Sequence, residues 1–136
     1  MQIDINELTE YDCANAKAGD KVIYAYMSSW GIAWSFTTHT IKSVSPKRGD
    51  ITLDDRFKSK FDKYGRLSGR GRYDMSRSLL LGYNEDNLKK VNAYIKYDKL
   101  LLKTKEQLEK LYTNWNAGLR NMPEEKLERL YALLTE

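Results

Sequence analysis

The chain has 136 residues, enough for one domain with a single substantial core. Charged residues make up 31% of it, and no apolar run approaches the roughly 18 residues of a membrane-spanning helix. The acidic start does not resemble a secretory or mitochondrial leader, and the lone Cys13 cannot form an internal disulfide. We therefore expect a cytoplasmic protein that does not interact with membranes.

The first residues with a structural signal are 9–16. Thr9 and Asp12 have nearly the spacing of a capping box, which predicts a short helix there. Runs of β-branched and aromatic residues between turn signals then predict strands. The expected strands are 21–27, 33–44, 51–53, 56–63 and 78–81. Short strands at this spacing favour a small, strongly bent antiparallel barrel of the SH3-like kind.

The pattern changes after residue 83. Asn84 is a plausible N-cap, and apolar residues at helical spacing predict a long helix over about 85–114. Pro123 suits the first position of a last helix, and the short connection predicts a helical hairpin. The predicted fold class is α+β, with a barrel domain over 1–83 and a helical hairpin over 84–136. The hairpin is expected to pack on the barrel or on a neighbouring subunit.

Positive charge is concentrated in one part of the chain. Residues 42–77 hold 11 Lys and Arg against 5 Asp and Glu, whereas the net charge of the whole chain is only +4. Within this part, residues 56–77 combine cations, aromatic rings and glycines, which favours contact with phosphates and stacking on bases. The predicted binding residues are Lys58, Lys60, Lys63, Tyr64, Arg66, Arg70, Arg72 and Tyr73. An acidic protein partner and a merely solvated strand edge stay open as alternatives.

Other chemistry is weakly indicated. The glycines 65, 69 and 71 do not follow a phosphate-loop or dinucleotide pattern, so we interpret them as bends in a curved sheet. One His and one Cys are too few for a structural zinc site, and His39 lies on a polar strand face without an evident catalytic partner. We expect no enzymatic activity, no metal and no cofactor. The tyrosines at 94, 97 and 112 lie off the leucine stripe of the long helix, so a homodimer through that helix is a further expectation.

The order of elements resembles a group of small bacteriophage and prophage proteins with an N-terminal β-barrel and C-terminal helices. The resemblance covers about residues 18–136. It is carried by the runs Gly19-Asp20-Lys21-Val22, Thr40-Ile41-Lys42-Ser43-Val44, Arg56-Phe57, Lys63-Tyr64-Gly65-Arg66 to Gly69, Ser78-Leu79-Leu80-Leu81, Pro123-Glu124-Glu125-Lys126-Leu127 and Leu133-Leu134. The acidic N-terminal segment and a longer insert between Phe57 and Gly65 depart from the pattern. The resemblance implies an accessory protein without catalytic residues, and it brings in a second hypothesis, a protein inhibitor of a bacterial host defence system.

Overall fold

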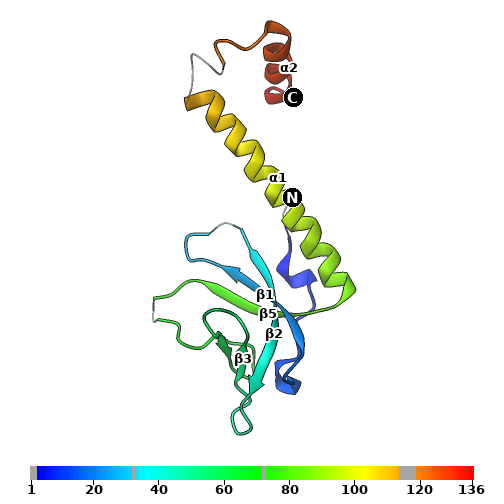
Figure 1. The fold of residues 1–136 in the computed structure, drawn as a ribbon, viewed down its shortest axis with the longest axis vertical. Helices are drawn as coiled ribbons and strands as arrows, with labels where there is room; N and C mark the ends of the chain where they lie inside the picture. Colours follow the sequence, from blue (N-terminus) through cyan, green and yellow to red (C-terminus); the bar gives the residue numbers. More distant parts are fainter. Residues whose placement is uncertain (1–2, 32, 72, 114–118) are drawn as a thin grey trace. The chain divides into compact units, whose positions relative to one another are not determined.

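The computed structural model describes residues 3–31, 33–71, 73–113 and 119–136 (Figure 1). The chain divides into two compact units, residues 1–95 and residues 96–136, which we describe separately. No helix in the described ranges is both long and apolar enough to span a membrane.

The first unit is built on a curled antiparallel sheet of five strands in the order β4-β3-β2-β1-β5 (Figure 1). The strands are β1 (Lys21–Met27), β2 (Ser35–Val44), β3 (Ile51–Leu53), β4 (Lys60–Phe61) and β5 (Arg77–Gly82). Phe61 on edge strand β4 makes an edge-to-face contact with Tyr24 on β1, with ring centroids 5.4 Å apart, although two strands separate them in the sheet. Such a contact requires a concave face, so the sheet is a half-barrel and the predicted α+β class is confirmed.

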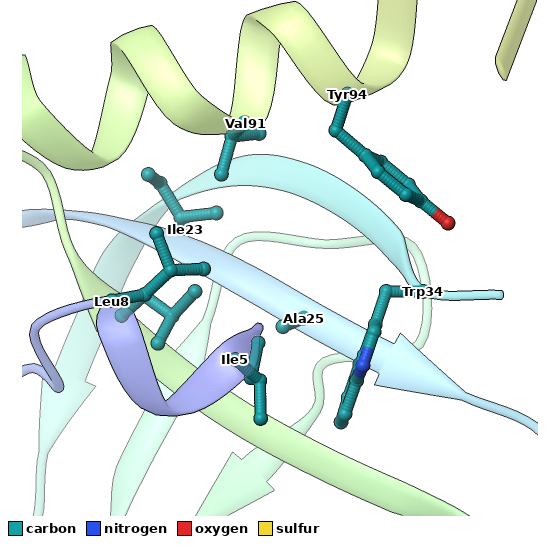
Figure 2. Packing of buried hydrophobic residues seen from close by; sticks show 8 residues of the cluster. Ile5, Leu8, Ile23, Ala25, Trp34, Val91 and Tyr94 are labelled. Carbon is teal, nitrogen blue, oxygen red and sulfur yellow. The ribbon is translucent and has the colours of Figure 1, made fainter. Parts of the chain in front are cut away.

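Apolar side chains cover both faces of the sheet. The concave face holds a core that includes Phe61, Ile41 and Leu53. On the convex face, Ile23 of β1 lies beneath Val91 of α1 (Glu85–Thr113), and Tyr94 of the same helix extends toward Trp34, as Figure 2 shows; all belong to one buried cluster. A sheet that is buried on both sides explains why β1 reads as a nearly continuous apolar run. Tyr94 is therefore a core residue, whereas the side chain of Tyr112 lies outside the described residues.

The predicted helix over 9–16 is wrong. Glu10 forms an isolated antiparallel bridge with Leu81, and the Tyr11 amide donates to the Leu80 carbonyl at 3.0 Å. Only Ile5–Glu7 and Cys13–Asn15 form short 3-10 turns. The free edge of β5 supplies the backbone partners that a local helix would otherwise supply, so tertiary pairing overrides the capping pattern.

The predicted strand over 56–63 is much shorter than expected. Only Lys60–Phe61 forms β4, because the residues before it make a tight turn. In that turn the Asp55 carboxylate accepts a hydrogen bond from the Ser59 amide at 2.7 Å, and Lys58 has a left-handed φ of 49°. An Asp side chain that bonds to backbone nearby favours a turn over a sheet ladder.

The long helix is confirmed as α1, with the Asn84 side chain accepting from the Asn87 amide at 2.8 Å. The last helix is α2 (Glu124–Leu134). Pro123 is its N-cap, so the helix begins one residue later than predicted. In the second unit no residue of α2 is buried, and several leucines of α1 beyond residue 99 are exposed. The expected hairpin and the homodimer through the long helix stay predictions.

Candidate nucleic-acid interface

The basic segment, residues 56–77, runs from the β3–β4 turn to the start of β5. It lies beside two hollows in the first unit. One is lined by the concave face of β1 and β2 together with residues 55–57 and 59, and we call it the aromatic groove. The other lies between residues 10–14, residues 63–67 and β5, and we call it the seam cavity.

The aromatic groove is built by alternation along two paired strands. Tyr24 and Tyr26 face it from β1, opposite Thr37 and Ser35 of β2 respectively. The Tyr24 and Tyr26 rings are tilted by 52° with centroids 6.4 Å apart. Because side chains alternate along a strand, residues two apart line the same face. The volume of the groove is about 480 Å³.

Histidine 39 lies at the inner end of this face. Its Nε2 is 2.8 Å from the Thr37 hydroxyl and its Nδ1 is 3.5 Å from the Asp54 carboxylate. The sequence suggested a solvated histidine, whereas the structure places it half-buried in a polar network. This network fixes the Thr37 side chain at the wall of the groove.

The seam cavity occupies the gap in the half-barrel. On one side of the gap, Glu10 bridges to Leu81 of β5. On the other side, Leu67 bridges to Phe61 of β4. The volume of the cavity is about 790 Å³. Its lining mixes cations with carboxylates, namely Lys63, Arg66 and Arg70 with Glu10, Asp12 and Asp74. The electrostatic character of this cavity is therefore neither strongly positive nor strongly negative.

Two arginines of the basic segment, Arg66 and Arg70, bond to groups of the segment's own loops. The Arg66 Nε donates to the Asp62 carboxylate at 2.9 Å, and Asp62 also accepts from the Tyr64 and Arg66 amides. These hydrogen bonds, led by the Arg66 amide, lower the pKa of Asp62. Arg70 donates to the carbonyls of Asp74 and Ser76. Of the predicted phosphate contacts, these two guanidinium groups are thus partly occupied within the chain.

The other cations of the basic segment have no carboxylate within ion-pair distance among the described residues. They are Arg56, Lys58, Lys60, Lys63 and Arg77, and all five are exposed. Arg56 was not among the predicted binding residues, although it begins the segment. Arg72, which was predicted, lies outside the described residues.

The aromatic residues of the segment divide clearly between core and surface. Phe61 is fully buried, whereas Phe57 is 83% exposed, Tyr64 70% and Tyr73 85%. Described cations lie over the rings of Phe57 and Tyr64. Arg56 is 5.8 Å from the Phe57 centroid, and Lys63 and Arg66 are 5.2 and 5.3 Å from that of Tyr64. These exposed rings are not needed for the core.

Glycine 65 shows why the segment contains glycines. Its φ of 81° is left-handed, and a Cβ there would lie 3.5 Å from the Cys13 Sγ. Gly69 has the same φ, whereas Gly71 does not have a left-handed φ. The interpretation of Gly65 and Gly69 as bend residues is supported by these angles.

None of the groove residues was among the predicted binding residues, and those on β1 and β2 were missed because each looked like an ordinary strand residue. The signal was present in the alternation of Tyr24 with Tyr26 and of Ser35 with Thr37 and His39. It became meaningful only once the two strands paired in register on a concave face.

In the described ranges, no three His, Cys, Asp or Glu side chains gather into a metal site. The chain matches no known protein family, and comparisons with curated proteins and with solved structures find no match. The resemblance to bacteriophage proteins therefore stays an expectation.

Proposed function

We propose that this protein is a non-enzymatic, cytoplasmic nucleic-acid-binding protein of the phage accessory type. Its ligand is nucleic acid or a nucleic-acid–protein complex, bound at the basic segment. The observation that carries the proposal is the combination, in one segment, of exposed aromatic rings with cations that have no carboxylate partner among the described residues. Proteins that bind nucleic-acid strands use cations to neutralise phosphates and exposed rings to stack on bases.

The geometry changes the expected roles of individual cations. Lys58, Lys60 and Lys63 are the main phosphate contacts in this proposal, with Arg56 at the edge of the aromatic groove. Arg66 and Arg70 mainly shape the loops that present them, because their guanidinium groups already bond within the chain. Tyr64 and Tyr73 stay the candidate stacking residues.

Binding of labelled single- and double-stranded DNA and RNA at several salt concentrations tests the proposal. Four phosphate contacts on a single strand predict a log–log salt slope of roughly −3, so affinity falls about 50-fold between about 50 and 200 mM salt. Replacing Lys58, Lys60 and Lys63 together by Ala should weaken binding to every nucleotide sequence tested. It should also reduce the steepness of the log–log salt slope by about 2.

The matched control replaces Lys96, Lys99 and Lys103 by Ala. These lysines are exposed on the part of α1 that belongs to the second unit, and the change in net charge is identical. The proposal fails if no nucleic acid binds at about 50 mM salt, where phosphate contacts are strong. It also fails if the control variant loses as much affinity as the triple variant, since general charge attraction would then suffice.

A second candidate function is binding to a protein, in line with the hypothesis of an inhibitor of bacterial defence. One observation favours it. Trp30, at the tip of the β1–β2 connection, is 96% exposed, and the Ser29 hydroxyl donates to Asp74 at 3.4 Å, next to the exposed Tyr73 and Met75. Trp and Tyr are enriched at protein interfaces. Salt-insensitive capture of one protein from nuclease-treated lysate, abolished by Trp30→Ala, would favour this function over the first.

A further inference from the structure

We propose that the aromatic groove is a pocket for a single unpaired nucleobase, so that the ligand of this protein is a single strand. The inference rests on the proposed function and specifies its substrate. It starts from the uncovered part of the concave face. Deeper in the half-barrel, Val22 of β1 and Ile41 of β2 belong to the buried core. Toward the β1–β2 connection the same face instead carries Tyr24, Tyr26 and two hydroxyl side chains.

These hydroxyl side chains are exposed although they lie on a core-facing surface. Ser35 and Thr37 are both exposed, and they lie opposite Tyr26 and Tyr24 in the strand register. The groove therefore offers flat apolar faces beside groups that donate and accept hydrogen bonds. That pairing matches a nucleobase, which has a π face for stacking and a polar edge for hydrogen bonding. The volume of about 480 Å³ lies within the range of small-molecule pockets.

The inner ring of the groove, Tyr24, is fixed by contacts with the core behind it. The Tyr24 ring stands edge-on to the buried Phe61 ring at 84°, and its hydroxyl lies 3.4 Å from the Ser78 hydroxyl. Tyr26 is 38% exposed and Phe57 forms the outer rim. A base that enters the groove thus meets a fixed inner ring and accessible outer rings. A fixed ring loses little conformational freedom on binding, which favours affinity.

The rim places a cation where the phosphate of an inserted nucleotide would emerge. Asp55 also lines the groove, but its carboxylate bonds to the amide and hydroxyl of Ser59. Arg56 has no acidic partner in the part of the chain that the structure describes, and it lies over Phe57. From Arg56 the exposed lysines 58 and 60 continue along the chain. With this arrangement, a base in the groove would have its neighbouring phosphates close to these cations.

The pocket selects single strands because a base cannot enter it while paired and stacked. Extruding a base from a duplex costs unstacking and unpairing free energy, and an already unpaired base avoids that cost. The exposed groups on the groove wall would then contact the base edge that pairing hides.

The test measures affinity by fluorescence anisotropy for one labelled oligonucleotide, alone and annealed to its complement, at about 50 mM salt where phosphate contacts are strong. The single strand should bind more tightly than the duplex. Tyr26→Ala should weaken single-strand binding by roughly 5- to 100-fold, the usual effect of removing one base-stacking ring, with little change in salt slope. Thr37→Val, which keeps the shape of the side chain, should weaken it to a smaller extent.

Tyr97→Ala is the matched control. Tyr97 is 37% exposed, nearly the same as Tyr26, but it lies on α1 in the second unit. Equal affinity for single strand and duplex, with Tyr26→Ala binding like the wild type, overturns the base pocket. If the Lys58, Lys60 and Lys63 variant still loses affinity in that case, the proposed function stands without it. Absence of any nucleic-acid binding overturns both.

Discussion

The two hollows beside the basic segment differ in what their charged groups do. In the seam cavity, Arg66 and Arg70 bond to groups of their own loops, and the lining holds both carboxylates and cations. In the aromatic groove, Asp55 is bonded to Ser59, and Arg56, the one Lys or Arg among the described residues that line the groove, lies over a ring. Charge in one basic segment therefore serves two purposes. Some of it holds the chain together, and some of it faces solvent in a form that a ligand can use.

The largest effect that sharpens this comparison should come from two phenylalanines four residues apart. Phe61→Ala should lower the free energy of unfolding by about 3–5 kcal/mol, because it opens a cavity in the concave core. Phe57→Ala should change it by less than about 0.5 kcal/mol, since its ring is exposed at the groove rim.

Urea unfolding followed by circular dichroism measures both variants. Phe57→Ala also serves as the control for Phe61→Ala, since the chemical change is the same in the same segment. A large loss of stability in Phe57→Ala would contradict its place at the rim and would make it a core residue.

The next largest effect on stability concerns residues 9–14, which include one wall of the seam cavity and are attached to α1 through Asn87. Asn87 of α1 is fully buried, and its amide nitrogen donates to the carbonyls of Thr9 and Gly82 at 2.9 and 2.8 Å. Its oxygen accepts from the Thr9 amide at 3.0 Å. Asn87→Ala should therefore cost about 1–3 kcal/mol, chiefly because the Thr9 amide loses its buried partner, whereas the Thr9 carbonyl still accepts from the Gly82 amide.

Asn92→Ala is the control, because Asn92 is exposed on the same helix. Urea unfolding should show a loss for Asn87→Ala alone, and amide exchange over residues 9–14 should become faster. Unchanged exchange there would mean that the pairing with β5 holds this wall without Asn87.

The fold was predictable where the signal was local. The β-branched and aromatic residues of Lys21–Met27 and the capping Asn84 set their elements without help from the rest of the chain. Residues 9–16 were predicted wrongly because their partners lie about 70 residues away, on β5. Patterns within a few residues cannot indicate a backbone partner that lies so far away in the sequence.

The candidate site was predictable in composition and not in arrangement. The sequence identified the cations and rings of the basic segment, but it treated Arg66 and Lys63 alike. Only the loop geometry shows that Asp62 engages the first, whereas no carboxylate among the described residues engages the second. The aromatic groove required the pairing of β1 with β2, which brings Tyr24 opposite Thr37. Strand register and curvature are long-range properties, and single residues do not specify them.

The reactivity of Cys13, which needs no change in stability, tests whether the seam cavity is a packed part of the fold or an accessible, reactive site. Cys13 lines this cavity but is buried, and burial, together with the nearby Glu10 and Asp12, raises the pKa of its thiol to about 11. The thiolate is the reactive form, so raising the pKa from 9.0 to about 11 leaves roughly 100-fold less of it at pH 8.

Native protein at pH 8 should therefore react with a disulfide reagent on the order of 100-fold more slowly than the same chain in concentrated urea. The unfolded chain is the control, because it contains the same cysteine without burial. A rate in the native state that matches the unfolded rate would show that the cavity admits the reagent and ionises the thiol. The seam would then resemble the groove as an accessible binding surface, and the contrast between the two hollows would not hold.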